Sequence, residues 1–370
     1  MDKKTVAYIT RHRVTNYGSA LQTYATHAVL ERLGYEAVCI DYIREAELSK
    51  NVASTRLSTS RWNANILTRI VYLLTQKPIM TTAAKRFDSY IGRLVKTTEK
   101  EYHSEQELKD DLPPADVYMT GSDQVWNIIS GIGVDPAYFL SFVPDDKKKI
   151  AYAASFGGAE VNDKDRPLMA KLLSRYQAIT VREKSGVKLV ESMGAQARQV
   201  LDPTLLIEQK DWLRIIPDRP CTEQYVLVYH LHPNKEFEAY AKEFAKRRGM
   251  KLIRIHPFWH HTFKPGEFIH CPPLEDFLWY IKNAFCLLTD SFHGTAFALG
   301  LNTPFTDVLP DKYSERIESL LAVTGLQSRI LKSYTDFDSP ALPIDFDKVN
   351  ERLASERKES LDCLKHMIED

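Results

Sequence analysis

Short apolar runs alternate with longer amphipathic stretches through the first half of the chain. TVAYIT at residues 5–10 has the composition of a strand, and residues 16–34 repeat their apolar positions about every 3.6 residues, as expected of a helix that stops at Gly34. YEAVCIDY predicts a second strand, so the chain opens with a β-α-β unit and a parallel strand pair. Four later runs predict strands that alternate with helical segments: DVYMT, KKIAYAAS, AITV and ARQVL.

The alternation stops at a linker rich in charge and proline, roughly Glu208 to Thr222, and then restarts. Later strands are predicted at YVLVYHL, KLIRIH, FCLLTD and TPFTDVL, with one long loop after KLIRIH. We therefore predict an α/β protein with two Rossmann-like domains, residues 1–207 and 222–345, and a C-terminal helix over residues 346–370. Ligands of such sheets bind beyond the carboxyl ends of the strands, so these ends can face each other across a cleft.

The composition is that of an ordinary globular protein, and it argues against several classes of partner and location. The 370 residues suggest two domains, and 49 basic residues balance 49 acidic ones, which argues against nucleic acid as a partner. The five cysteines are scattered without a CxxC pair, as expected in a reducing cytoplasm. The N-terminal apolar stretch is too short for a signal peptide, and no run approaches the roughly 20 apolar residues of a membrane span. We expect a cytoplasmic protein.

Four turns that follow predicted strands carry the candidate chemistry, and one of them is LTDSFHGTAF at residues 288–297. It combines Ser291, His293, Gly294 and Thr295 at the start of a predicted helix. Free backbone N–H groups and the positive end of the helix dipole favour an anion there, the hydroxyls add donors, and an imidazole titrates near neutral pH. A helix cap followed by a core histidine would produce the same letters, but the position at a strand end favours a site.

Two other turns place polar residues between a strand and a helix. RHRVTNYGSALQ runs from Arg11 through Asn16, Tyr17 and Gly18; it lacks the GxGxxG spacing of a dinucleotide loop, and a capped helix explains Asn16 equally well. In ITVREKSG, Arg182 directly follows a strand and opens a helix. A guanidinium opposes the helix dipole at that place, which indicates that it binds a carboxylate or phosphate.

The remaining turn, MTGSDQVWN, suits a carbohydrate. Ser122, Asp123 and Gln124 offer polar groups for hydroxyls, and Trp126 offers an aromatic face for the apolar side of a sugar ring. An Asx turn with a packing tryptophan is the structural alternative.

Taken in order, these segments resemble the polysaccharide pyruvyl transferase family over almost the whole chain. The matching blocks are NYGSALQTYA, GSDQVWN, YAASFG, VREKSG with LDPTLL, and PPLEDFLWYIKNAFCLLTDSFHGTAFALG. The resemblance implies a glycosyltransferase-B-like fold. It also implies an enzyme that transfers the enolpyruvyl carbons of phosphoenolpyruvate onto two hydroxyls of one sugar, giving a cyclic ketal and free phosphate. No step of that reaction needs a metal or redox cofactor.

The resemblance carries over mainly His293 and Arg182, and the chemistry of this reaction, read against the four turns, suggests roles for further residues. His293 is the expected proton donor or phosphate ligand, and Asp123 is the expected base for the sugar hydroxyl. The expected donor site comprises Arg182, Ser291, His293, Gly294, Thr295, Arg11 and Arg316. The expected acceptor site comprises Asn16, Tyr17, Gly18, Ser122, Gln124, Trp126 and His230. The acceptor is expected to be a glycan, lipid-linked in the assembly of an envelope or capsular polysaccharide.

The chain departs from the family pattern at three places. In one branch of the family an arginine stands two residues before the final histidine, where this chain has Ser291. An acid follows the N-x-G of the first block there, where this chain has Ser19, and the glycine-rich third block is replaced by GSDQVWN. The chain therefore resembles a divergent branch, in which Arg11, Arg13 or Arg316 takes over the donor phosphate.

The loop RIHPFWHHTFKPGEFIHC gathers side chains of metal-ligand type: His256, His260, His261, His270 and Cys271. Pro257 disfavours a helix that would align His256 with His260, and neither HExxH nor CxxC occurs. We predict no metal site and expect the loop to contact the acceptor.

The stretch from Arg56 to Lys96 contains eight basic residues and one acid, Asp88, around the apolar run ILTRIVYLL. One interpretation is a surface helical hairpin that packs its apolar stripe on the domain. The other is a face that rests on an anionic membrane leaflet.

Two other functions fit the overall pattern. A nucleotide-sugar glycosyltransferase of this shape would place a carboxylate in the second domain for the ribose diol, but no acid occurs between Asp290 and Asp307. A non-catalytic sugar-binding or assembly protein would account for the serine at position 291.

Overall fold

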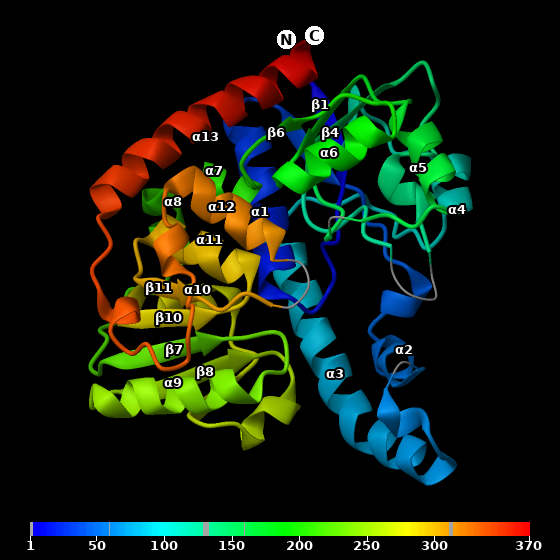
Figure 1. Ribbon diagram of the computed structural model, residues 1–370. Helices are drawn as coiled ribbons and strands as arrows, with labels where there is room; N and C mark the ends of the chain where they lie inside the picture. Colours follow the sequence, from blue (N-terminus) through cyan, green and yellow to red (C-terminus); the bar gives the residue numbers. More distant parts are fainter. Residues whose placement is uncertain (1–2, 59, 129–132, 159, 311–313) are drawn as a thin grey trace.

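Two separate parallel sheets form two α/β domains in the computed structural model, which describes residues 3–58, 60–128, 133–158, 160–310 and 314–370. Figure 1 shows the first sheet in the upper half of the view and the second in the lower left half. The chain changes from one sheet to the other between Gln199 and Tyr225. The predicted domain limits at residues 207, 222 and 345 stay predictions.

The first sheet has six strands in the order β2-β1-β3-β4-β5-β6, and every neighbouring pair is parallel. The register between β4 and β5 shifts beside Ala153, which has a left-handed φ of 52°. The strands are β1 (Thr5–Ile9), β2 (Glu36–Cys39), β3 (Val117–Thr120), β4 (Lys148–Ala154), β5 (Ala178–Val181) and β6 (Arg198–Gln199).

The second sheet has five parallel strands in the order β11-β10-β7-β8-β9. Its strands are β7 (Tyr225–Tyr229), β8 (Lys251–His256), β9 (Glu267–His270), β10 (Cys286–Thr289) and β11 (Phe305–Asp307). The long loop predicted after β8 is wrong in one respect, because β9 pairs along β8 within it. Half-buried on an edge, β9 lacks the continuous apolar run that marks the central strands.

Helices cover both faces of each sheet and join the sheets at the centre (Figure 1). Gly34, with φ 96°, follows the end of α1, as its place in the sequence predicts. The predicted linker contains helix α8, so it is not an open segment. The helices are α1 (Tyr17–Arg32), α2 (Val52–Ser58), α3 (Ile66–Leu94), α4 (Glu105–Asp110), α5 (Arg166–Leu173), α6 (Lys184–Ser192), α7 (Pro203–Leu206), α8 (Gln209–Ile215), α9 (Lys235–Arg247), α10 (Leu274–Asn283), α11 (Phe292–Leu301), α12 (Glu315–Thr324) and α13 (Phe346–Glu369).

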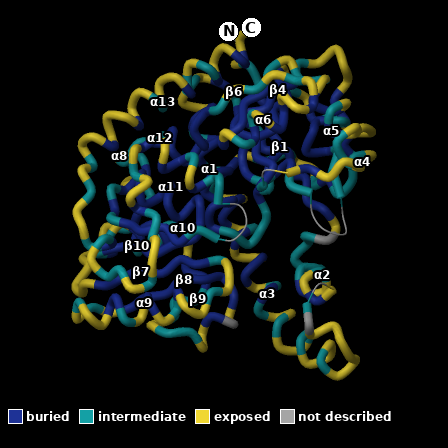
Figure 2. Tube along the Cα trace, in the orientation of Figure 1, coloured by how far each residue is buried: buried dark blue, intermediate teal, exposed yellow. Residues whose placement is uncertain are grey.

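One hydrophobic core runs through both domains. In β7, Leu227 and Tyr229 face this shared core, whereas Val226 and Val228 face a separate core under α9, as the period of two along a strand requires. The shared core includes side chains of α1, α7, α10, α11 and α13. Figure 2 shows this continuous buried region, with exposed residues along the outside of α13. The shared core holds the carboxyl ends of the two sheets against each other.

The predicted C-terminal helix is present as α13 and returns to the first domain. It places the two chain ends side by side (Figure 1), and the Tyr35 hydroxyl donates to Glu369 at 2.6 Å. The Lys148 ammonium donates to the carbonyl of Ile368 at 3.1 Å. Within the described ranges, no helix combines the length and apolar character needed to span a bilayer.

Candidate active site

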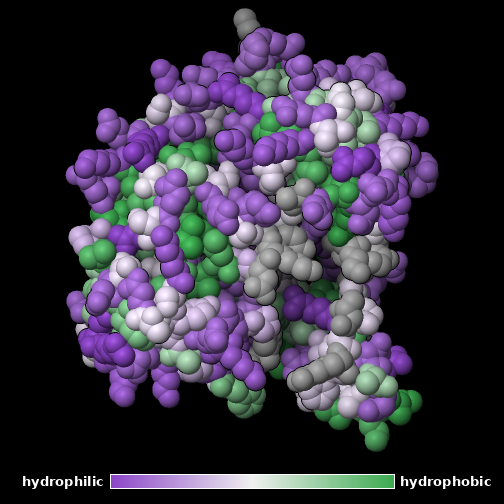
Figure 3. Space-filling model, viewed as in Figure 1, coloured by the Kyte–Doolittle hydropathy of each residue, from purple (hydrophilic) through white to green (hydrophobic). Residues whose placement is uncertain are grey.

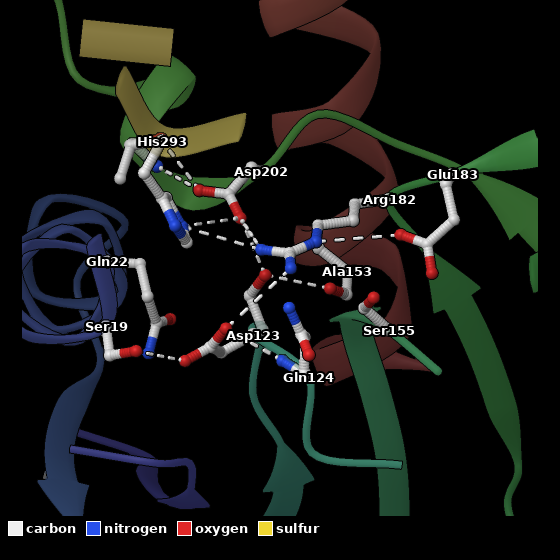
Figure 4. Close-up of polar contacts among 12 residues, drawn as sticks. Ser19, Gln22, Asp123, Gln124, Ala153, Ser155, Arg182, Glu183, Asp202 and His293 are labelled. Atoms are coloured by element: carbon white, nitrogen blue, oxygen red, sulfur yellow. Dashed lines mark hydrogen bonds and ion pairs between the residues drawn. The ribbon is translucent and has the colours of Figure 1, made fainter. Parts of the chain in front are cut away.

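The turns that follow β1, β3, β5 and β10 meet where the two domains touch (Figure 4). His293 lies in the first turn of α11 and packs against the first turn of α1 in the other domain. A Cβ atom at Gly18 would lie only 2.2 Å from Nδ1 of His293, so α1 can approach this closely only with glycine at that position. Gly18 therefore shapes the site rather than offering a ligand-binding side chain.

Arg182 is the centre of a buried network of charges that joins His293 to the first domain. Its Nη1 donates to Oδ2 of Asp202 at 2.9 Å and lies 3.5 Å from Nε2 of His293. That imidazole nitrogen lies 3.8 Å from the same Asp202 oxygen. On its other side, Nη2 of Arg182 lies 3.7 Å from Oδ1 of Asp123. Arg182 and Asp202 are fully buried, so their charges interact with little solvent screening.

This network keeps both aspartates ionised. Burial alone would raise the pKa of Asp202, but hydrogen bonding and charge at His293, together with Arg182, hold it well below its usual value. Burial likewise opposes ionisation of Asp123, and Arg182, His293, Arg11 and the Ser19 hydroxyl outweigh it, so the pKa of Asp123 is lowered. At neutral pH both Asp123 and Asp202 are therefore ionised.

Asp123 has an unusual backbone conformation that aims its carboxylate. Its φ is 75°, a left-handed value that non-glycine residues adopt at a cost and that often marks functional sites. The carboxylate accepts hydrogen bonds from the Ser19 hydroxyl at 2.5 Å and from the backbone N–H of Gln124 at 2.8 Å. Ser19 stands where part of the family has an acid. In this chain its hydroxyl orients Asp123, the acid in the turn that follows β3.

A cleft of about 510 Å³ opens beside this network, between the two domains. Seven of the residues predicted for the site line it: Arg11, Asn16, Asp123, Gln124, Ser291, His293 and Arg316. The lining also includes residues outside the predicted donor and acceptor sites, among them Thr15, Glu47, Val52, Thr55, Arg56, His232, Asp290 and Phe292.

Two helices, one from each domain, begin at the cleft. Asn16 caps α1 by accepting from the N–H of Ser19 at 3.2 Å, and Ser291 caps α11 by accepting from the N–H of Gly294 at 3.3 Å. Both caps line the cleft. Two helix N-termini with their positive dipole ends converge there, which favours a ligand with negative charge.

The arginines of the cleft differ in their partners. Arg11 is paired with Glu47 at 2.5 Å, and Arg13 is paired with Asp41 at 2.6 Å and with Glu101. Arg316, at the start of α12, donates from both Nη atoms to the side-chain oxygen of Gln124, at 2.6 and 3.1 Å, when the amide is oriented to fit its neighbours.

The hypotheses for Trp126 and Tyr17 as acceptor contacts are wrong in this structure. Trp126 is 1% exposed, stacks on Phe139 with ring centroids 5.2 Å apart and donates from Nε1 to the carbonyl of Tyr138. Tyr17 is fully buried and stacks on Phe277 at 4.2 Å. Both rings are packed inside hydrophobic cores, so neither can present a face to a sugar.

Ser122, Gly294 and Thr295, also predicted for the site, support its walls instead of lining them. The Ser122 hydroxyl donates to Asp202 at 2.8 Å, and the Thr295 hydroxyl donates to Asp307 at 2.6 Å. At Gly294 a Cβ would lie 2.5 Å from Oγ1 of Thr289, so the residue must be small for α11 to start directly on β10.

His230 and Arg182, which were also predicted for the site, do not line the cleft either. His230 is buried, stacks on Phe237 and lies 3.4 Å from Asp290; burial lowers its pKa to about 4. The nearby His232 lines the cleft instead, and its Nδ1 lies 2.7 Å from Oδ2 of Asp290. Arg182 does not line the cleft, because three carboxylates within 4 Å already engage its guanidinium.

The histidine-rich loop shows no metal centre in the part of the chain that the structure describes. No group of three or more His, Cys, Asp or Glu side chains is arranged there to hold an ion. The rings of His256 and His261 stack 3.6 Å apart, and Nε2 of His270 lies 3.1 Å from the carbonyl of Pro257. The side chain of His260 lies outside the described residues.

Asp202 is a functional candidate that the sequence reasoning missed, although it lies in the matching block LDPTLL. It follows the short strand β6 after Val200 and Leu201, and it precedes α7, which it caps through the N–H of Thr204. An acid after a strand and before a helix is the pattern that singled out the other turns, so the same signal points to Asp202.

Comparison with known proteins gives one match to a family and several to folds. A model of the family described as polysaccharide pyruvyl transferase matches residues 16–310, most of the chain. No curated protein matches the sequence.

Among solved structures, the Staphylococcus aureus MnaA–UDP co-structure matches with 12% identity and a TM-score of 0.52 over 92% of this chain and 86% of that chain. UDP-N-acetylglucosamine 2-epimerase from Rickettsia bellii matches with 11% identity and a TM-score of 0.50 over 99% and 97%. The trehalose-6-phosphate synthase OtsA matches with 8% identity and a TM-score of 0.52 over 99% of both chains. At such identities the likeness concerns the fold alone, and it confirms the glycosyltransferase-B-like architecture.

Proposed function

Because the chain belongs to the polysaccharide pyruvyl transferase family, a family of transferase enzymes, we propose that it transfers pyruvate from phosphoenolpyruvate onto two hydroxyls of one sugar. The product is a cyclic ketal and the leaving group is phosphate. One observation carries the proposal: two capped helix N-termini, from different domains, converge with His293 on a single cleft. A small donor with a phosphate and a carboxylate matches two such anion-favouring ends.

The donor lies between the starts of α1 and α11. Backbone N–H groups of both first turns and the side chain of Arg316 receive its negative groups. Arg316 replaces the arginine that part of the family carries at the position of Ser291. Arg11 and Arg13 shape the cleft through their ion pairs with Glu47, Asp41 and Glu101.

His293 and Asp123 move the protons. His293 donates a proton to the methylene carbon of the donor while the first sugar hydroxyl adds to the neighbouring carbon. The second hydroxyl then displaces phosphate from that carbon and closes the ketal. The two hydroxyls lose two protons in total. One is balanced by the proton that His293 adds to form the new methyl group, and the other leaves with phosphate. Asp123 accepts a hydroxyl proton, and its lowered pKa means that transfer accompanies formation of the C–O bond.

Arg182 and Asp202 act as positioning residues. Asp202 lies 3.8 Å from Nε2 of His293 and places a carboxylate beside the ring, while Arg182 offsets the repulsion between the buried carboxylates. Neither needs to touch the substrates, which agrees with their burial behind the cleft.

The acceptor enters from the side of α2. Thr55 and Arg56 of that helix line the cleft together with Glu47. We expect the sugar to belong to an envelope polysaccharide precursor carried on a lipid. No metal or redox cofactor is required.

Release of phosphate from phosphoenolpyruvate tests the proposal, measured with a panel of saccharide acceptors and without acceptor. The wild-type protein is expected to release phosphate only with an acceptor. His293→Ala should lose at least about a hundredfold in kcat, the usual scale for a general acid. His366→Ala, on the exposed end of α13, is the matched control and should be unaffected.

The same experiment separates the two rival functions. If nucleotide sugars, and not phosphoenolpyruvate, raise the melting temperature, the protein is a glycosyltransferase of this shape. If saccharides bind while no donor turns over, the protein is a non-catalytic sugar-binding member of the family. Near-normal turnover by His293→Ala would remove this residue from the chemistry.

A further inference from the structure

The exposed large apolar side chains of the described residues gather on two segments. Of eleven such side chains, six lie on residues 62–74 and two lie on the short 3-10 helix η4 (Trp259–Phe263). The other three, Leu168, Leu213 and Leu342, stand apart from one another in the sequence. We call the larger group the apolar tip; it consists of Trp62, Ile66, Leu67, Ile70, Val71 and Leu74. Monomeric proteins rarely expose such contiguous groups without a partner.

All of the apolar tip except Trp62 lies on α3, on its outer face and not on the face that packs on the protein. Tyr72 and Leu73 pack against a small core around Ala53 and Met80. The tip residues from Ile66 to Leu74 recur at helical spacings of one, four, five and eight residues, which places them together on a different face. Leu67 and Leu74 are each 73% exposed. Figure 1 shows α2 and α3 extending beyond both sheets, and Figure 3 shows hydrophobic atoms at the end of this extension.

The second domain adds a neighbouring apolar group. Phe258 packs in the small core with Ala53 of α2, and the guanidinium of Arg56 lies 3.9 Å from the Phe258 ring. The helix η4 begins at the next residue, so it lies beside α2. Within it Trp259 is 45% exposed and Phe263 is 94% exposed. Two domains thus present apolar side chains from adjacent segments.

The segment that carries the apolar tip has charges of one sign only: residues 48–87 contain seven Lys or Arg and no Asp or Glu. In residues 257–266 the one charged side chain, Lys264, pairs with Glu238 at 2.9 Å and adds no free charge. Arg69 and Lys77 are exposed on α3 itself. A symmetric contact with a second copy of the chain would bring these like charges together, which is unfavourable. A bilayer with anionic head groups would neutralise them and would accept the tryptophans at its interface.

We propose that the apolar tip and η4 dock on an anionic lipid bilayer and hold the mouth of the cleft beside it. Val52, Thr55 and Arg56 of α2, the helix next to the docking segments, also line the cleft. A saccharide carried on a lipid in that bilayer therefore reaches the cleft without leaving the membrane surface. This last step rests on the proposed function, whereas the docking itself does not.

Flotation of the full-length protein with vesicles tests the docking. The protein should float with vesicles of equal parts phosphatidylcholine and phosphatidylglycerol, and much less with phosphatidylcholine alone or at high salt. Leu67→Ser/Leu74→Ser should weaken binding about tenfold for each side chain removed from the interface. Arg69→Gln/Lys77→Gln should weaken it about fivefold for each charge removed. Leu168→Ser/Leu342→Ser, two exposed leucines elsewhere, is the matched control and should float like the wild type.

Three results would overturn the proposal. The first is no flotation of the wild type at low salt. The second is equal loss of binding in the control variant. The third is a dimer by light scattering that Leu67→Ser/Leu74→Ser converts to a monomer, since this would assign the face to a second copy of the chain. Phosphate release with a water-soluble acceptor should be unchanged in Leu67→Ser/Leu74→Ser. Absence of that activity in the wild type would count against the proposed function alone.

Discussion

Substitution of Gly18 by alanine tests whether the contact between the two domains at His293 positions the catalytic group. The new Cβ atom would lie 2.2 Å from Nδ1, 2.4 Å from Cγ and 2.6 Å from Cβ of His293, well inside normal contact distance. Because three atoms of one buried side chain overlap, His293 must change rotamer or α1 and α11 must separate. Either response moves the imidazole away from Asp202 and Arg182.

The expected effect on stability is small and the effect on activity is large. Overpacking of this kind costs about 1–3 kcal/mol, and the better helix propensity of alanine returns up to about 1 kcal/mol. The net loss is therefore about 0–3 kcal/mol, which leaves the protein folded. Displacement of a catalytic group by about 1 Å lowers the rate about a hundredfold.

The assay combines thermal unfolding with phosphate release from phosphoenolpyruvate. Gly92→Ala is the matched control, because Gly92 lies in α3 and a Cβ atom there would meet no other atom within 4 Å, so this variant should keep both stability and activity. If Gly18→Ala keeps wild-type kcat and KM while it remains folded, His293 does not depend on this contact and the reasoning is refuted.

Three further predictions concern the buried groups around the site. Arg182→Gln leaves Asp123, Glu183 and Asp202 without their guanidinium and should lower the free energy of unfolding by about 3–5 kcal/mol, whereas Arg198→Gln, which breaks an exposed pair, should change it by at most about 1 kcal/mol in denaturant titrations. Trp126→Phe should lower the free energy of unfolding by about 1–3 kcal/mol and leave the acceptor KM unchanged; a raised KM with unchanged stability would restore Trp126 as a sugar contact. Burial raises the pKa of Asp307 to about 8, so the folded state favours the protonated acid and stability should fall as pH rises from about 4 to about 8. Asp307→Asn should remove this part of the pH dependence and raise the melting temperature at pH 8 more than at pH 5; an equal shift at both would contradict it.

Much of the architecture was predictable because the strands of parallel sheets are continuous apolar runs. YVLVY, CLLT and VYMT are buried on both faces, so their apolar composition identifies them as strands. The edge strand β9 was not predicted, since EFIH is only partly buried and has a polar residue at each end, as a loop segment often does. Helix α8 was not predicted because its charged and proline-rich surroundings are typical of a linker. Its Trp212 nevertheless packs in the shared core.

The site was predictable to the level of its turns, but not to the level of individual side chains. His293, Asp123 and Ser291 lie in the cleft because residues that follow strand ends meet at one edge of a parallel sheet. Trp126 and Tyr17 stand in the same turns and point into the cores instead. Which way a side chain points depends on packing partners such as Phe139 and Phe277, which lie outside these turns.

The sequence by itself determined the alternation of strands and helices, the family and the strand-end turns, since each depends on local periodicity and residue type. The tertiary structure alone decided that Arg182 is engaged by three carboxylates, that Asp202 stands behind His293, and that Gly18 must lack a side chain. Those features arise from contacts between segments up to 275 positions apart, as between Gly18 and His293. Burial and electrostatic pairing at such separations follow from how the two domains pack, which no local pattern of residues encodes.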